Sequence, residues 1–167
     1  MTRGNIYLLR QALNLLDQLD DDVYARVPSE VSKAGIGGHL RHCLDFYGAF
    51  LRSFSQRKID YDLRERNELV EKDRSAASAK IETAIAELQQ LPAIGEDQEL
   101  LVKLEGQEAD DSSAWNRSSI RRELQFLLSH TVHHYALISM LLRSQGFQPA
   151  ADFGVAPSTL KYWQAKA

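Results

Sequence analysis

The sequence predicts an all-α chain, an antiparallel four-helix bundle formed by one domain over residues 1–167. Four segments repeat apolar side chains at steps of three and four residues, which is the period of a helix with one buried face. Such faces have nothing to pack against except each other, and this favours a bundle. With 167 residues and 44% hydrophobic residues, the chain is long enough to form the core that a bundle needs.

The first two helices are predicted over residues 6–19 and 38–55. The apolar side chains of the first are Ile6, Leu9, Leu13, Leu16 and Leu19. Those of the second form a broader face of Leu40, Cys43, Phe46, Tyr47, Phe50, Leu51 and Phe54. Three glycines at positions 35, 37 and 38 precede or open the second helix, and they allow a tight approach or an unusual entry turn there.

The next segments are more polar. The stretch "RKIDYDLRERNELVEKD", residues 57–73, is predicted as a loop leading to a third helix over residues 75–91, which Pro92 ends. Residues 93–118 allow two interpretations. One is a short hairpin near 98–117, because "LLVKLE" and "SAWN" flank a turn region rich in Gly and Asp, and the other is an irregular excursion over the bundle end.

The fourth helix is predicted over residues 120–144, with Ser118 or Ser119 as its N-cap and Gly146 as its end. It is apolar nearly all round, which is typical of a helix packed on several sides, either in the bundle or against another subunit. We therefore expect a homodimer. The tail, residues 147–163, has two prolines and several aromatic residues and is predicted to be an ordered strap.

Composition excludes several kinds of function. The net charge of −3 gives no general attraction to nucleic acid or to anionic lipid, so neither is expected as a partner. A lone cysteine, Cys43, excludes an intrachain disulfide framework and a zinc site built from cysteines. Its place on the apolar face predicts a buried small side chain rather than a nucleophile. No apolar stretch is long enough to span a bilayer and no cleavable signal is evident, so a cytoplasmic protein is expected.

All five histidines lie in two of the predicted helices. His130 and His134 are four residues apart, so they share a face and can direct two ring nitrogens to one point. A third nitrogen from a facing helix would complete a three-histidine site for a divalent metal with open positions, of the kind that bundle cores hold. His133 points about 100° away from His134 and is the weaker partner.

The second helix offers two candidates for the third ligand. His39 lies within the apolar face, whereas His42 lies at its edge beside Asp45, so periodicity slightly favours His39. The contrasting interpretation is that the histidines are structural and satisfied by hydrogen bonds. The sequence contains neither HExxH nor ExxH, which argues against a zincin protease and against a ferritin-like di-iron site. Haem held by facing histidines is a third interpretation, without a supporting motif.

Two stretches, "IGGHLRHCLDFYGAFL" and "ELQFLLSHTVHHYALISMLL", resemble the DinB-like (YfiT-like) superfamily of four-helix proteins. In that superfamily an I-G-x-x-x-x-H segment supplies one metal ligand, and Ile36, Gly37 and His42 match it. A later H-x-x-H-H supplies the other two, and it corresponds to the histidines at 130, 133 and 134. The resemblance therefore implies His42, His130 and His134 as ligands, with His39 and His133 beside the site.

The resemblance covers most of the chain and extends to "YDLRER" and to the block "FGVAPSTL". It implies one divalent ion, nickel, zinc or iron, and a thiol-dependent transferase or a hydrolase acting on a small-molecule substrate with a low-molecular-weight thiol as partner. The alternative function is a non-catalytic dimeric bundle that serves as an interaction or small-molecule sensing module.

Three further residues are candidates around such a site. Arg64 and Arg66 could bind an anionic substrate or an acidic thiol, or could pair with Asp62 in a loop held by surface ion pairs. Asp45 could accept a hydrogen bond from a histidine ring and so orient it, or could be an exposed helix acid.

Overall fold

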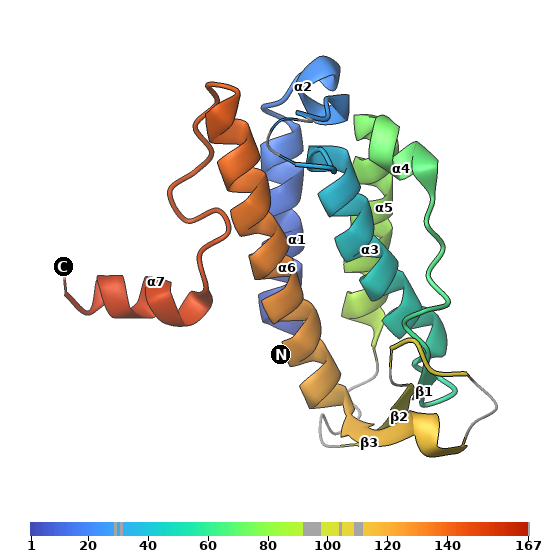
Figure 1. Cartoon of the computed structure of the whole chain (residues 1–167). Coiled ribbons are helices and arrows are strands. Elements are labelled where there is room, and N and C mark those ends of the chain that lie inside the picture. Colours follow the sequence, from blue (N-terminus) through green and yellow to red (C-terminus); the bar gives the residue numbers. More distant parts are fainter. Residues whose placement is uncertain (29, 31, 92–97, 104, 109–111, 167) are drawn as a thin grey trace.

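The computed structural model describes residues 1–28, 30, 32–91, 98–103, 105–108 and 112–166. The protein is mostly helical, with a small sheet at one end (Figure 1). Its four long helices are α1 (Thr2–Leu16), α3 (Ile36–Ser53), α5 (Arg74–Gln90) and α6 (Ile120–Ser144). Helix α3 packs on α5 and α6, and α1 packs on the same two helices from the other side. The four predicted helical segments are therefore present, with ends that differ by a few residues for the first three.

The long helices do not alternate in direction along the chain. Figure 1 shows α1 and α6 running one way and α3 and α5 running the other. The reason is the connection from α3 to α5, which returns along the side of the bundle before α5 begins (Figure 1). Helices α3 and α6, which carry all five histidines, are therefore neighbours of opposite direction.

The sheet has three strands, β1 (Lys58–Ile59), β2 (Glu99–Lys103) and β3 (Trp115–Ser119). Strands β2 and β3 pair antiparallel, as predicted for the hairpin, with a short 3-10 helix at Ser112–Ala114 before β3. The pairing of β1 with β2, which is parallel, was not predicted, because two residues of a polar stretch give no alternating pattern. Residues 93–97, 104 and 109–111 of the interpreted region lie outside the described residues.

Two short helices occupy segments predicted as connections: α2 (Asp21–Ala25) and α4 (Glu68–Lys72). Each begins at a capping side chain, because Asp20 accepts a hydrogen bond from the Val23 N–H and Asn67 accepts one from the Leu69 N–H. A single turn is too short for the helical period to appear in the sequence, so the loop prediction over residues 57–73 was wrong at α4, and α2 was not predicted.

Both predicted ends of α6 are present. The Ser119 hydroxyl accepts a hydrogen bond from the Arg122 N–H, and Gly146 has a positive φ of 82°, which ends the helix. The tail then crosses the bundle, where the ring of Phe153 stacks on that of Tyr135 with 4.6 Å between centroids. It ends in α7 (Pro157–Gln164), a helix with no buried residue that projects from the bundle (Figure 1).

The core contains one linked set of polar side chains. The Tyr47 hydroxyl donates to Asn5 Oδ1 at 2.7 Å, and Asn5 Nδ2 donates to the Leu124 carbonyl at 3.0 Å. Thr131 donates to the Leu127 carbonyl and lies 3.3 Å from the Tyr47 hydroxyl. These bonds join α1, α3 and α6 deep in the bundle and fix how α3 and α6 face each other. Among the described residues, no helix combines the length and hydropathy needed to cross a bilayer.

Candidate metal centre

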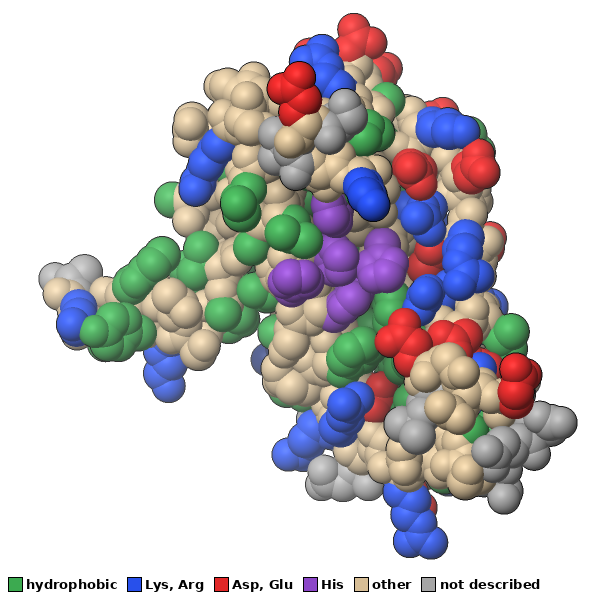
Figure 2. Space-filling view, in the orientation of Figure 1, with side chains coloured by type: hydrophobic (Ala, Val, Ile, Leu, Met, Phe, Trp, Pro, Cys, Tyr) green, Lys and Arg blue, Asp and Glu red, His purple; other side chains and the backbone are tan. Residues whose placement is uncertain are grey.

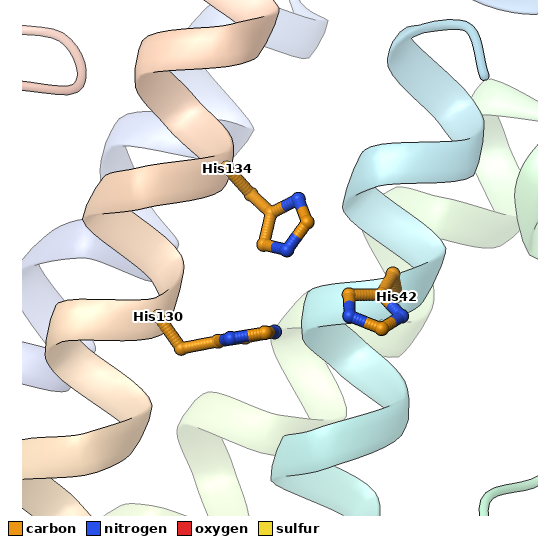
Figure 3. A group of neighbouring side chains, drawn as sticks. All are labelled: His42, His130 and His134. Atoms are coloured by element: carbon orange, nitrogen blue, oxygen red, sulfur yellow. The ribbon is translucent and has the colours of Figure 1, made fainter. Parts of the chain in front are cut away.

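Three histidine rings converge on one point between α3 and α6 (Figure 3). His42 comes from α3, and His130 and His134 come from successive turns of α6. One nitrogen from each ring can be chosen so that all three lie within 4.8 Å of one another. The ring centroids are 4.5 to 5.0 Å apart. Three imidazole nitrogens at this spacing, from two packed helices, fit a divalent metal ion.

The state of the ring nitrogens agrees with that fit. Nε2 of His130 is buried and has no hydrogen-bond partner among the described residues. A buried nitrogen without a partner is unfavourable unless something binds it, and a metal ion would satisfy it. His134 uses its Nδ1 in a 3.0 Å contact with Nδ1 of His39, which leaves its Nε2 for the common point.

The two histidines in α3 lie differently with respect to the cluster. His42 belongs to the group of three, whereas His39 lies outside it and contacts His134, with 5.2 Å between ring centroids. Periodicity had slightly favoured His39 as the inward ring, and the resemblance had favoured His42. His133 is exposed and meets the His134 ring edge-on at 5.1 Å, outside the group of three.

Burial keeps these rings neutral. Loss of solvent is the largest cause that lowers the pKa of His42 and of His130 to about 4, and that of His134 to about 3. Charges on the neighbouring histidines lower all three further, and the Arg64 guanidinium adds to the effect on the first two. Only a neutral imidazole has a free lone pair for a metal, so at neutral pH the cluster is in the form that binds one.

Glycine at position 37 explains how α3 enters this region. A side-chain Cβ there would overlap the carbonyl oxygen of Glu71 and press on the Tyr24 ring, so only glycine lets α3 approach α4 so closely. Arg41 then ties α3 to the same residue, with Nε 2.8 Å from Glu71 Oε2. The close approach and the ion pair together hold the first turns of α3, where His39 and His42 stand.

Asp45 is buried, with 5% of its surface exposed, but its partners are not histidines. Arg41 donates to its Oδ2 at 2.8 Å. The expectation of an exposed acid is therefore not met, and within the described part of the chain no hydrogen bond links this carboxylate to an imidazole. Arg66 is exposed, with a positive φ of 51°.

Arg64 lies over the ring of Phe46, with its guanidinium carbon 4.7 Å from the ring centroid. Asp62, the partner considered for it from the sequence, instead pairs with Lys103 at 3.1 Å and accepts the Gly106 N–H. The loop is therefore held by Lys103, which also pairs with Asp60.

Phe46 is part of the site, although its spacing suggested only a core residue. Its ring centroid lies 4.4 Å from that of His130 and 4.9 Å from that of His42. Tyr61 and Phe126 complete the aromatic wall, at 5.1 and 5.7 Å from the same ring. The position of Phe46 in the sequence could have indicated this, because it is four residues after His42 and therefore lies one turn further along the same helix face.

The cluster lies at the molecular surface rather than in a closed chamber. Figure 2 shows the histidine side chains together in one patch on the face where α3 and α6 meet. His39, His42, His130 and His134 are each half-buried. A small molecule therefore has direct access to a metal held there.

Comparison with known proteins gives one extensive match and one partial one. Residues 9–164 match the family model described as DinB family. A protein from Rhizopus delemar named FK506-binding protein 5 is 33% identical over 104 residues, which are 62% of this chain and 27% of that protein. The chain thus spans little more than a quarter of that relative's length. No solved structure matches the sequence significantly.

Proposed function

The chain belongs to the DinB family, and from this premise we propose that it is a metal-dependent enzyme acting on a small molecule. His42, His130 and His134 would hold one divalent ion, nickel, zinc or iron. The observation that carries the proposal is the convergence of these three rings, together with the buried and unpartnered Nε2 of His130. Within that class we propose a thiol-dependent transferase or a hydrolase.

The chemistry follows from the ligand set. A divalent ion with three histidine ligands and open positions acts as a Lewis acid, or lowers the pKa of a thiol or water so that it becomes a nucleophile at neutral pH. The protein supplies neutral rings, because burial holds the pKa values of His42, His130 and His134 well below 6.5. The wall of Phe46 and Phe126 excludes water from one side of the cluster.

His39 would orient His134. One of the two Nδ1 atoms must carry the hydrogen that lies between them, and either His134 or His39 can be the donor. If His134 donates, its Nε2 carries a free lone pair; if His39 donates, that Nε2 is protonated and cannot bind a metal. Metal binding therefore selects the assignment in which His134 donates and His39 accepts, the usual role of a group behind a metal ligand.

Metal content tests the proposal directly. Elemental analysis of the purified protein, or of protein stripped by a chelator and reloaded, should give close to one divalent ion per chain. His130→Ala and His134→Ala should each lose it, whereas His133→Ala is the matched control, because it removes an exposed ring next in sequence. Wild-type protein that retains no metal on reloading would overturn the proposal and favour the non-catalytic interaction or sensing module.

The reaction class needs its own measurement. A thiol-dependent transferase should accelerate the attack of a thiol on a fluorogenic alkyl halide, with the sulfur–carbon bond formed as halide leaves and the thiol proton is released. A hydrolase should instead cleave an activated ester without added thiol. In both assays the rate should require the metal and should be lost in His130→Ala.

We also propose that two copies of the chain associate. The supporting observation is apolar surface left exposed on the tail and on α6: Tyr162 at 55%, Trp163 at 50% and Met140 at 64%. The mass measured by light scattering during gel filtration should be twice that of one chain. A double substitution of Tyr162 and Trp163 by serine should shift it to a single chain, and an unchanged mass would remove the tail from the interface.

A further inference from the structure

Arg64 lies against an aromatic ring of the three-histidine cluster. Among the residues that the structure describes, no carboxylate is paired with its guanidinium and no acceptor receives its hydrogen bonds. Its guanidinium carbon contacts the face of Phe46. A half-buried guanidinium usually finds a carboxylate, because its five donors are otherwise only partly solvated.

Two acids within electrostatic reach of Arg64 already have other partners. Asp45 is bonded to Arg41 at 2.8 Å, and Asp62 is bonded to Lys103 at 3.1 Å. Arg41, the other cation near the cluster, is itself held between Asp45 and Glu71. Arg64 therefore differs from Arg41, because its guanidinium donors have no acceptor among the described residues.

The loop around Arg64 is anchored on both sides. Before it, Tyr61 is buried, with its hydroxyl donating to Glu123 Oε2 at 2.9 Å, and Asp60 pairs with Lys103 at 2.8 Å. After it, Asn67 caps α4, with its side chain accepting a hydrogen bond from the Leu69 N–H at 3.0 Å. Because the backbone is held on both sides of Arg64, the position of this residue is set before a ligand binds. Ligand binding then costs little conformational entropy.

The guanidinium and the histidine cluster contact one shared side chain. Phe46 links the two, because Arg64 covers its face while His42 and His130 contact the same ring.

We propose that Arg64 binds the carboxylate of a small thiol acid whose sulfur reaches the three-histidine centre. This deepens the proposed function and rests on it. A planar guanidinium pairs with a carboxylate through two parallel hydrogen bonds, and one uncommitted guanidinium matches one carboxylate. The ligand class is therefore a short molecule that carries a thiol at one end and a carboxylate at the other.

The experiment compares two thiols of similar size, mercaptoacetate and mercaptoethanol, which differ in having a carboxylate or a hydroxyl. Protein loaded with cobalt(II) as a spectroscopic ion is titrated with each, and binding is followed by the change in visible absorption. The metal retained by the protein is measured afterwards. The readout is the ratio of the two dissociation constants, so it does not depend on activity.

Wild-type protein should favour mercaptoacetate, and Arg64→Gln should reduce that preference by about 10- to 100-fold, the effect expected for losing hydrogen bonds to a charged group. Arg64→Lys should retain part of it, since the charge remains but the planar donor pair is lost. Arg66→Gln is the matched control, because it removes the same charge from the same loop at an exposed position, and its ratio should equal that of wild type.

Two results would overturn the inference, and they are distinguishable. If every variant binds cobalt but Arg64→Gln keeps the wild-type ratio, Arg64 only stacks on Phe46 and the metal proposal stands. If wild-type protein binds no cobalt, the proposed function fails and the inference fails with it. Unchanged melting temperature in Arg64→Lys keeps the comparison valid should Arg64→Gln fold poorly.

Discussion

His39 and His134 meet through their Nδ1 atoms at 3.0 Å, although the two residues are 95 positions apart in the chain. The contact joins α3 to α6 on the side of His134 that faces away from the common point of the three rings. It ties a histidine outside the cluster to one inside it, so the orientation of the His134 ring is set by the packing of two helices.

The first prediction concerns that contact. His39→Ala should weaken metal binding by about 10- to 100-fold without abolishing it, because it removes the partner that orients a ligand rather than a ligand. His133→Ala should leave the affinity unchanged, since His133 is exposed and meets the His134 ring only at its edge. Competition with a chromogenic chelator measures both. Complete loss of metal in His39→Ala would instead make His39 a ligand.

The second prediction concerns pH and the protein stripped of metal. In the unfolded chain histidines take up protons below about pH 6.5, whereas burial keeps the pKa of His42 and His130 at about 4 and that of His134 at about 3 in the fold. Between these values the unfolded state binds more protons, so the free energy of unfolding should fall as pH falls. The free energy of unfolding should have its full value at pH 7 and should be clearly smaller at pH 5.

Urea unfolding at the two pH values measures this effect. A double variant, His130→Gln with His134→Gln, removes two of the titrating rings and should show a smaller difference between pH 7 and pH 5. A difference as large as that of wild type would assign the pH dependence to other groups.

A third prediction concerns the entry of α3. Gly37→Ala should destabilise the fold by about 1–3 kcal/mol or more, because the added Cβ would overlap the backbone carbonyl of Glu71, which cannot move without shifting α4. Gly48→Ala is the control within the same helix. Its Cβ would meet only the end of the flexible Arg52 side chain, so helix propensity should leave it neutral or slightly stabilising. Thermal unfolding of both variants, followed by circular dichroism, should separate them.

A fourth prediction concerns the buried polar set that joins three helices. Tyr47→Phe removes the hydroxyl that donates to Asn5 and leaves a buried amide oxygen without that donor, which should reduce the free energy of unfolding by about 1–3 kcal/mol. Tyr7→Phe removes an exposed hydroxyl bonded to Asp152 and should change it by less than about 0.5 kcal/mol. Equal effects in denaturant titrations would show that burial does not decide the outcome.

Much of the helical core could be predicted because its signals are local and periodic. The segment 120–144 coincides with α6, since a hydroxyl cap and a terminal glycine mark its ends as clearly as the apolar repeat marks its length. The spacing of His130 and His134 likewise fixes their common face. Short elements gave no such signal, so α2, α4 and β1 were missed.

The surroundings of the cluster depend on contacts between distant segments, which no local pattern encodes. Lys103 lies about forty residues beyond Asp62 and yet pairs with it, which frees Arg64 from the partner that sequence proximity suggested. In the same way, the choice between His39 and His42 depends on how α3 is rotated against α6, and this rotation follows from core packing around Tyr47.

The spacing of the three histidines along the chain also orders events during synthesis. His42 leaves the ribosome early, and the other two follow 88 and 92 residues later, so a nascent chain holds one member of the set until α6 is complete. Docking of α6 onto α3 buries apolar and tyrosine side chains that belong to the chain itself. These contacts would bring the three rings together in the assembled fold, so the proposed site would be complete only after the last long helix has docked.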